Sequence, residues 1–477
     1  MRCSAPTSPS PPSCASSCRC GWPAGSPSAP GRWTWRCCSS SPSLAWCWPG
    51  WSRPRPERRR VTLRSDHPER PRDLARRRRS NPAPGCYRQD RWRSSRMSLH
   101  EPLKFAYWVP NVSGGLVVST IEQRTSHDPA YNVEVAQAAE RVGFEYALTQ
   151  VRYLASYGAD AQHESTSFSL ALLLATQKLK VIAAVHPFFW HPGVLAKFAA
   201  TAQELTQDRL ALNVVSGWFK NEATQLGVTW HEHDERYRQS EEFIELLRGV
   251  WSEDGYTQRG DFFSAEDITF RPQPKVQPEL FQGGNSTAAQ AMAGRVSDWY
   301  FMNGKSIADA AAGVREVSAL AAGNGRSVKF ALNGFGLVRD TREEAEAVLE
   351  EIIAKADVAK VEGFGAAVQE AGNATADRKG MWADSEFRDL VQYNDGFRTG
   401  LVGTPDEVAR RIMAYRLVGV DLLLLAFLHV KEEVEAFGEL VIPRVRELEA
   451  RLVAGEDLQL GPELDEAVAA ATAPVPA

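Results

Sequence analysis

The stretch RLALNVVSGWFKNEATQLGVTWHEHDERYRQSEEFIELLRGVW, residues 209–251, contains one complete strand-to-helix unit. It opens with a run of apolar residues typical of a buried strand and then passes through a polar connection. It ends in a helix with one apolar face, formed by Phe243, Leu246, Leu247 and Val250. A buried strand followed by an amphipathic helix is the repeating unit of parallel α/β sheets, so this stretch predicts an α/β fold.

The same alternation recurs along the chain from Met97 onward. Seven further apolar segments are strand candidates, each followed by a helical pattern: 104–110, 145–150, 180–187, 278–284, 298–304, 328–338 and 421–427. Eight right-handed strand–helix crossovers return the sheet to its start, so we expect a (β/α)8 TIM barrel with insertions. A doubly wound open sheet is the alternative.

The segments outside this alternation give the expected domain organisation. We place the barrel in residues 97–455, with a strand-like excursion at 256–274. Residues 362–400 are rich in glycine and irregular, and they are long enough to form a lid. Residues 456–477 are expected to be a frayed tail.

The first 96 residues differ sharply in composition from the rest. They contain 20 Arg, no Lys and 5 acidic residues, lack Phe and Ile, and hold all eight cysteines of the chain. Such a segment cannot build a core, and we expect it to be disordered and non-globular. Our preferred interpretation is a misassigned start, with translation beginning at Met97; a transit peptide and a functional disordered tail are alternatives.

From Met97 onward the composition limits the partners and the compartment. This part holds 35 basic and 54 acidic residues, which argues against nucleic acid as a partner. It has no cysteine, so it forms no disulfide and carries no thiolate site, in keeping with a cytoplasmic protein. We also expect no membrane association, because no apolar run is long enough to span a bilayer.

Histidines and other polar residues follow the strand at 209–217. In a barrel, ligands meet the carboxyl ends of the strands, where Ser216 and the run from His231 to Tyr237 would lie. The spacing of His231 and His233 resembles the paired ligands of metal-dependent barrel hydrolases, for which His186 and His429 are further candidates. No carboxylate completes that set, so we expect no metal.

The stretch FQGGNSTAAQ, residues 281–290, ends a strand in two glycines and opens a helix. Backbone N–H groups at a helix start, with no side chain at Gly283 or Gly284, can form an anion cradle. An ordinary Ser286 N-cap explains the pattern equally well. No G-x-G-x-x-G follows a strand, so a Rossmann-type nicotinamide site is not expected.

Several of these motifs, taken together, resemble the bacterial-luciferase-like flavin monooxygenases over roughly residues 103–450. They are FAYWVPNVSGG, ALTQVRY, NVVSGW, HDERYRQSEEF, FQGGNS, VSDWYFMNG and YNDGFRTGLVGTP. The resemblance implies a barrel that uses O2 and reduced FMN (FMNH2) from a separate NAD(P)H-dependent FMN reductase. Within the family, the motifs are most similar to the branch that converts dimethylsulfone to methanesulfinate and formaldehyde. We expect a cytoplasmic homo-oligomer, a dimer or a tetramer.

The resemblance also implies roles for individual residues. The cofactor-binding residues would be Asn111, Gln150, His186, Ser216, His233, Tyr237, Gly284, Asn285 and Ser286. The catalytic residues would be His233, Asn333 and Arg398, and the substrate-binding residues would be Trp108, Asn333, Phe335 and Phe427.

Departures from sulfonate-cleaving members of the family bear on the substrate. Those members have an Arg and a His on the seventh strand where this chain has Asn333 and Phe335, a Tyr where it has Phe427, and a Cys in the region that here reads QVRYLASYG. A pocket without cations suits a neutral sulfone, because a buried unpaired anion is costly. Alkanesulfonate oxidation with Arg398 as the cation, deazaflavin-dependent hydride transfer, and a non-catalytic flavin-binding barrel are the alternatives.

Overall fold

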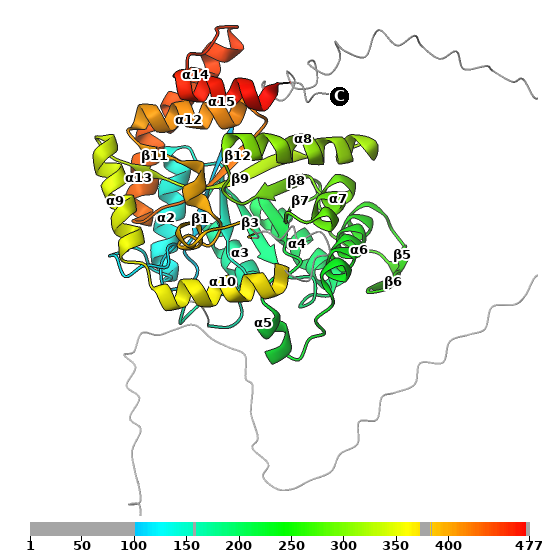
Figure 1. The fold of residues 1–477 in the computed structure, drawn as a ribbon. Coiled ribbons are helices and arrows are strands. Elements are labelled where there is room, and N and C mark those ends of the chain that lie inside the picture. Colours follow the sequence, from blue (N-terminus) through cyan, green and yellow to red (C-terminus); the bar gives the residue numbers. More distant parts are fainter. Residues whose placement is uncertain (1–100, 156–158, 373–381, 383, 474–477) are drawn as a thin grey trace, which may run out of the picture. The chain divides into compact units, whose positions relative to one another are not determined.

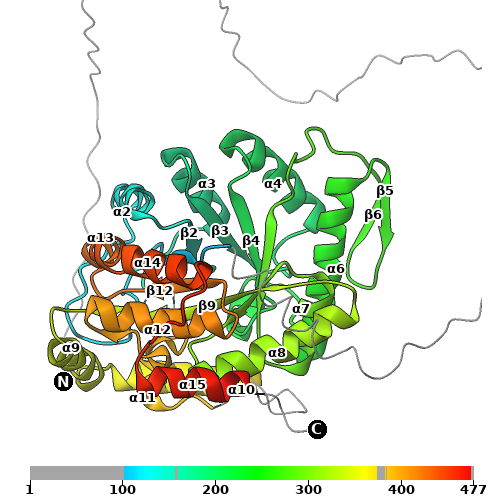
Figure 2. The ribbon, with the colours of Figure 1, turned by 90° about the horizontal axis from the view of Figure 1, so that it is seen from above.

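A computed structural model of the protein describes residues 101–155, 159–372, 382 and 384–473. The expected non-globular segment, residues 1–96, lies outside this range, as does part of the expected lid. The described residues contain a closed barrel of eight parallel strands surrounded by helices, which confirms the TIM-barrel prediction (Figures 1 and 2).

The barrel strands match the eight predicted segments in position. They are β1 (Lys104–Val109), β2 (Tyr146–Thr149), β3 (Lys180–Val185), β4 (Leu210–Val214), β7 (Glu279–Gly283), β8 (Trp299–Met302), β9 (Lys329–Phe335) and β12 (Leu422–Ala426). Each pairs in parallel with the barrel strands before and after it, and the barrel closes where Lys104–Tyr107 of β1 pair with Leu422–Leu425 of β12.

Helices connect successive strands and form an outer layer around the barrel, which Figure 2 shows from above. They are α2 (Pro129–Val142), α3 (Ser165–Ala175), α4 (Pro192–Thr206), α6 (His233–Ser252), α7 (Thr287–Val296), α8 (Ile307–Gly323), α12 (Pro405–Leu417) and α13 (Val430–Leu440). Local sequence fixes their starts; Thr404, for example, forms a capping box with Glu407 ahead of α12.

Insertions add elements outside this repeat. They are α5 (Lys220–Gln225), β5 (Tyr256–Arg259), β6 (Ser264–Ile268), β10 (Leu337–Val338), α9 (Arg342–Ala354), α10 (Val358–Gly372), α11 (Phe387–Leu390), η1 (Gly396–Thr399), β11 (Val402–Gly403), α14 (Ile442–Val453) and α15 (Pro462–Thr472). The predicted excursion after α6 is the antiparallel hairpin β5–β6, which lies outside α6 in Figure 2.

The inside of the barrel is filled by side chains from alternate strand positions. Successive side chains of a strand point to opposite faces, so every second residue faces inward. The inward set forms a separate apolar cluster that includes Leu148, Ile182, Phe281, Phe301 and Leu424, all buried. This cluster fills the barrel axis below the carboxyl ends of the strands.

A half-buried polar cluster occupies the opposite, amino-terminal end of the barrel. Glu279 accepts hydrogen bonds from Tyr146 Oη at 2.9 Å and from Trp299 Nε1 at 3.0 Å, and its Oε2 lies 2.7 Å from Lys180 Nζ. All four residues begin their strands, so the cluster joins β2, β3, β7 and β8 at one level. Burial opposes ionisation of Glu279, but Lys180 and the three hydrogen bonds outweigh it and hold its pKa below the usual value.

The prediction of a frayed tail is wrong for most of that segment. Residues Pro462–Thr472 form α15, which packs against α8 and α12. Leu458, Leu460 and Leu464 are buried there, and the carboxylate of Asp465 accepts hydrogen bonds from the backbone ahead of the helix. The sequence pattern was too short to distinguish an anchoring helix from a polar tail. Residues 474–477 lie outside the described range.

Candidate functional site

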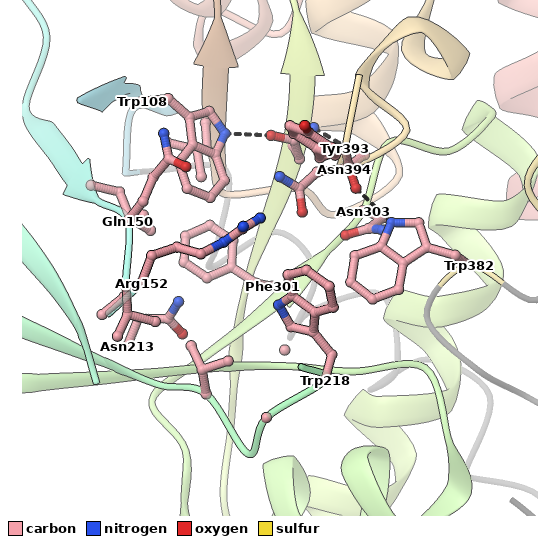
Figure 3. A pocket seen from close by; sticks show the side chains of 18 of the residues that line it. Trp108, Gln150, Arg152, Asn213, Trp218, Phe301, Asn303, Trp382, Tyr393 and Asn394 are labelled. Atoms are coloured by element: carbon pink, nitrogen blue, oxygen red, sulfur yellow. Dashed lines mark hydrogen bonds between the residues drawn. The ribbon is translucent and has the colours of Figure 1, made fainter. Parts of the chain in front are cut away.

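A cavity of about 240 Å³ opens at the carboxyl ends of the barrel strands (Figure 3). Polar side chains and glycine surround it, each from a different strand end: Trp108, Gln150, Asn213, Gly283, Asn303 and Asn333. Its floor is apolar and includes Leu148, Ala184, Phe301 and Leu424 from the inward-facing strand positions. An apolar floor with polar groups at its edge suits a flat aromatic ring system with polar ring edges.

The structure brings seven of the predicted site residues to this cavity. They are Trp108, Gln150, Ser216, His233, Tyr237, Gly284 and Asn333. The other predicted site residues are not among the cavity lining, and the contacts that each of them makes are described below.

Asn111 and His186 lie behind the cavity wall. Asn111 holds the end of β2: its Oδ1 accepts from Gln150 N at 2.9 Å and its Nδ2 donates to Gln150 O at 3.0 Å. His186 Nδ1 lies 2.8 Å from Val215 O, and burial lowers the pKa of this histidine to about 4. A neutral His186 that donates to Val215 supports the wall, and neither residue lines the space itself.

Phe335 and Phe427 do not line the cavity, which corrects their predicted role in substrate binding. Phe427 belongs to the outward-facing set of β12 and packs in an aromatic cluster with Phe144 and Phe437. Phe335 is covered by Phe397 of η1, with ring centroids 4.9 Å apart. The sequence comparison aligned the strand ends but could not show which loop covers them.

Arg398 is paired with acidic residues and does not line the cavity either. Its Nη2 lies 3.3 Å from Asp384 Oδ2, and its Nε lies 4.0 Å from Asp389 Oδ2. The predicted catalytic role of Arg398 therefore lacks support in the geometry.

Asn333 and Trp108 reach the cavity, but their polar groups are committed to each other and to a loop. Trp108 Nε1 donates to Asn333 Oδ1 at 2.6 Å. Asn333 Nδ2 donates to Asn394 O at 2.9 Å and to Gln392 Oε1 at 3.3 Å. Asn333 thus fastens the loop at 391–395 to the barrel, and its amide is already used by protein partners.

One face of α6 supplies polar side chains to the other side of the cavity. His233, Arg236, Tyr237 and Ser240 are spaced by three or four residues and therefore share that face. Ser240 Oγ lies 2.8 Å from Ser216 Oγ, which ties α6 to the end of β4. Arg236 is buried, donates to His231 O at 2.9 Å and stacks on Trp230 with Cζ 4.2 Å from the ring centroid.

The start of α7 faces this same region. Gly284 has a φ of 136°, and a Cβ there would lie 2.5 Å from Tyr237 Oη and 2.6 Å from the Cβ of Ala289. Asn285 and Ser286 follow it, and Ser286 caps α7 by accepting from Ala289 N at 3.2 Å. Neither of these two side chains is among the cavity lining. The predicted Ser286 cap is confirmed, and an anion here would be met by backbone N–H groups.

Sequence reasoning gave no individual role to several polar or aromatic residues of the cavity wall, among them Arg152, Asn213, Trp218 and Arg236. Arg236 belongs to the run from His231 to Tyr237 that the sequence placed at the strand ends, and it lies three residues after His233 on the same helix face. Asn213 occupies an inward position by strand alternation. Arg152 follows β2 in an irregular connection, where no periodicity assigns a direction. The prediction that the pocket lacks cations is therefore wrong.

The expected lid, residues 362–400, contributes to the wall where it is described. Phe364 of α10, Trp382 and Trp218 pack edge-to-face, with centroid distances of 5.4–5.9 Å. Tyr393 and Asn394 complete this side. Residues 373–381 and 383 lie outside the described range, and residues 362–372, where we expected irregular chain, belong to the helix α10.

A buried carboxyl group lies directly behind this wall. Asn303, which lines the cavity, donates from Nδ2 to Asp395 Oδ2 at 3.2 Å. Asp395 is fully buried, and burial raises its pKa to about 7 despite the hydrogen bond from Asn303.

The raised pKa of Asp395 predicts a pH-dependent stability. The folded state keeps this proton up to about pH 7, whereas the unfolded chain loses it near pH ~4. The free energy of unfolding should therefore fall as pH rises through that window, by up to ~4 kcal/mol. Asp395→Asn should remove most of this fall, so that the variant melts higher than the parent at pH 8 and similarly at pH 4. Identical melting profiles for parent and variant would contradict the assignment; the exposed Asp340→Asn is the matched control.

The described residues also bear on metal binding and on membrane spans. Those residues contain no group of three or more His, Cys, Asp or Glu side chains placed to hold a metal ion. Among the helices they form, none is long and apolar enough to cross a membrane.

Comparison with known proteins gives the family. Residues 103–422 match the family model for luciferase-like monooxygenases. An FMNH2-dependent dimethylsulfone monooxygenase of Pseudomonas putida is 58% identical over 353 residues, which cover 74% of this chain and 97% of that protein. Its counterpart in Pseudomonas fluorescens strain Pf0-1 is 57% identical over 351 residues, covering 74% and 96%.

Solved structures with low sequence identity share the fold. The crystal structure of riboflavin lyase (RcaE) with modified FMN and riboflavin superposes with a TM-score of 0.65 at 19% identity, covering 75% of this chain and 96% of that one. The similarity in fold agrees with the barrel, and the family model spans most of its strands. The chain therefore belongs to the luciferase-like monooxygenase family.

Proposed function

We propose that this protein is an FMNH2-dependent monooxygenase that cleaves a C–S bond of dimethylsulfone with O2, giving methanesulfinate and formaldehyde. The observation that carries the substrate assignment is the extensive identity to the two dimethylsulfone enzymes. A separate NAD(P)H-dependent reductase would supply the reduced flavin. We further propose that the protein works in the cytoplasm as a homo-oligomer, a dimer or a tetramer.

The residues present fit FMN on two observations. Arg236 Nε is buried and has no hydrogen-bond partner among the described residues, so a donor stands ready beside the cavity. The absence of a Cβ at Gly284 lets Tyr237 Oη and Ala289 approach the backbone closely at the start of α7, so that this backbone stays uncovered by a side chain of its own. We therefore assign the flavin phosphate to Gly284, Asn285, Ser286 and Arg236, where positive helix-end and guanidinium groups converge.

The remaining cavity residues would hold the ring system and exclude water. Gln150, Ser216, His233 and Tyr237 provide polar contacts around the apolar floor of Phe301 and Leu424. When bound, reduced FMN supplies the electrons that activate O2. The aromatic cluster of Trp218, Phe364 and Trp382 lies along one side of this space, where it shields the reacting groups from water.

Arg236→Met should weaken binding of reduced FMN by about tenfold to a hundredfold, because a hydrogen bond to a charged group contributes roughly 1.5–3 kcal/mol. The measurement is anaerobic titration of reduced FMN followed by protein fluorescence. Arg238→Met is the matched control: Arg238 lies two residues further along α6, is exposed and pairs with Asp261. Equal affinity of the Arg236 variant and the parent would move the phosphate to another loop.

The substrate assignment is tested by turnover with reduced FMN across sulfones and sulfonates. We expect formaldehyde and methanesulfinate from dimethylsulfone, with slower turnover of methanesulfonate and longer alkanesulfonates. Sulfonates belong in the panel because Arg152 and Arg236 place two cations at the cavity. Faster turnover of alkanesulfonates than of dimethylsulfone would establish the protein as an alkanesulfonate monooxygenase. Hydride transfer from a reduced deazaflavin would establish it as a deazaflavin-dependent oxidoreductase.

A further inference from the structure

The cavity has two sides that come from different halves of the barrel. The polar residues assigned to the flavin follow β2, β4 and β7 or belong to α6, and β2, β3, β4 and β7 are neighbours in the barrel. The other half consists of β8, β9, β12 and β1. Asn303, at the end of β8, and Asn394 line the cavity on that second side, together with Tyr393 and Trp382 (Figure 3). A small substrate that lies beside the flavin would meet these residues.

The backbone of Asn394 is fixed to the ends of two barrel strands. Its carbonyl oxygen accepts hydrogen bonds from Gly304 N, just after β8, at 2.8 Å and from Asn333 Nδ2 of β9 at 2.9 Å. Its own N–H donates to Gln392 Oε1 at 3.2 Å. Because these three bonds hold the main chain on both sides of the Cα, the side chain of Asn394 starts from a fixed point at the edge of the cavity.

The side chain of Asn394, by contrast, is not used by the protein. It lines the cavity, and no hydrogen bond joins its amide to another of the described residues. A primary amide without partners offers two N–H donors and one acceptor to a ligand. The neighbouring amides are already engaged: Asn333 Nδ2 fastens the loop, and Asn303 Nδ2 donates to Asp395 Oδ2 at 3.2 Å. Of these three asparagines, Asn394 alone keeps both N–H groups for a ligand.

The surroundings of Asn394 are aromatic. Tyr393 packs edge-to-face on Phe364 with ring centroids 4.7 Å apart, and Phe364 packs on Trp382 at 5.6 Å. Trp382 Nε1 donates to Tyr393 O at 2.6 Å, so this indole donor is already used. One amide beside an aromatic wall suits a small molecule that has apolar methyl groups and oxygen atoms that only accept hydrogen bonds. Dimethylsulfone has both features.

We infer that the side-chain amide of Asn394 donates a hydrogen bond to a sulfonyl oxygen of dimethylsulfone; this inference rests on the proposed function. Donor and substrate are both neutral, so the contact leaves no unpaired charge in a space from which water is excluded. A donor on a fixed backbone holds the sulfonyl group in one place while the methyl groups pack on the aromatic wall. Asn394 is accordingly assigned as a substrate-binding residue.

The test measures ligand binding to the anaerobic complex of the protein with FMNH2, in which dimethylsulfone cannot be oxidised. For Asn394→Ala we expect the Kd of dimethylsulfone to rise by about threefold to tenfold, because one neutral hydrogen bond is lost. Asn394→Asp keeps the shape but replaces the donor by a carboxylate that repels the sulfonyl oxygens, so the Kd should rise by at least about tenfold.

Two further readouts separate a substrate contact from a structural role. Asn394→Ala should keep the melting temperature of the parent and change the affinity for FMNH2 by less than about twofold, because its amide bonds to no other described residue. Dimethyl sulfide is the matched control ligand, since it has the same two methyl groups and no oxygen; it should bind the parent and Asn394→Ala equally well. Asn324→Ala, which removes an exposed amide at the end of α8, should change the binding of neither compound.

Three results would overturn the inference. One is an Asn394→Ala variant that binds dimethylsulfone as tightly as the parent. Another is a loss of FMNH2 affinity as large as the loss of dimethylsulfone affinity, since Asn394 would then be a cofactor contact. The third is an equal loss of affinity for dimethylsulfone and dimethyl sulfide, since packing and not a hydrogen bond would then be the cause. A parent protein that binds dimethylsulfone but leaves it unchanged after O2 is admitted would refute the proposed function and not this contact, which separates the two failures.

Discussion

Gly284→Ala is expected to lower the affinity for reduced FMN by at least about a hundredfold. The added Cβ would lie 2.5 Å from Tyr237 Oη and 2.6 Å from the Cβ of Ala289, and the φ of 136° is one that residues with side chains rarely adopt. Strain and overpacking of this kind cost ~2–4 kcal/mol, and the backbone that must move to relieve them is the proposed phosphate cradle. Anaerobic flavin titration measures the effect, and circular dichroism checks the fold.

Gly323→Ala is the matched control, because it adds the same methyl group at the end of α8 where nothing lies within 4 Å. It should leave flavin binding and melting temperature nearly unchanged. If Gly284→Ala bound reduced FMN as tightly as the parent, the start of α7 would not be the phosphate site.

Glu279→Ala is expected to lower the free energy of unfolding by ~2–4 kcal/mol, which corresponds to a fall in melting temperature of roughly 5–15 °C. The substitution leaves Lys180 without its carboxylate partner and removes the acceptor of Tyr146 and Trp299. Unpaired polar groups inside a barrel cost more than the same groups at the surface. Thermal unfolding followed by circular dichroism measures the loss.

The pH dependence gives this prediction a second readout. Because the pKa of Glu279 is held below its unfolded value, its stabilisation is complete above that unfolded value and is lost as pH falls through the folded pKa. The difference between parent and variant should therefore shrink in acid. Glu351→Ala, which breaks a pair whose two side chains are each 50% exposed, should change stability by less than about 0.5 kcal/mol. Equal losses for both variants would show that the half-buried cluster around Glu279 contributes no more to stability than an exposed ion pair.

The barrel could be predicted from sequence because each strand carries its own signal. A short apolar run, a turn and an amphipathic helix recur eight times, and the closed arrangement follows from right-handed crossovers. Residues 456–473 were misjudged because α15 is stabilised by contacts with α8 and α12, which lie far away in the sequence. Such tertiary contacts leave little trace in a local pattern.

The alternation of side chains along a strand explains which predicted site residues line the cavity and why one of them does not. Trp108, Gln150 and Asn333 line the cavity because strand ends point there. Asn333 was expected to act on the substrate, but its amide group binds a loop some 60 residues later in the chain. The local sequence around Asn333 contains no sign of that loop. Phe427 was wrongly predicted to face the cavity. A shift of one residue along a strand moves a side chain to the opposite face, and Phe427 packs in the outer layer.

The irregular connections after β2 and β4 explain why the position of Arg152 could not be predicted from the sequence. Arg152 stacks on Trp218 and Phe219, and Glu222 accepts hydrogen bonds from the backbone N–H groups of the two residues that follow Arg152. These three partners all belong to the connection after β4. No sequence period relates these two connections, so only the folded structure reveals that they meet. The stretch at 209–251, which indicated the fold, therefore also contains the residues that pack against Arg152 in the connection after β2.

One measurement tests the central claim most directly. Protein loaded anaerobically with one equivalent of FMNH2 and excess dimethylsulfone is mixed with O2, and formaldehyde and methanesulfinate are quantified after a single turnover. We predict that both products form in equal amounts, approaching one of each per FMNH2 oxidised. Oxidation of the flavin with hydrogen peroxide as the only product, and with dimethylsulfone recovered intact, would contradict the account.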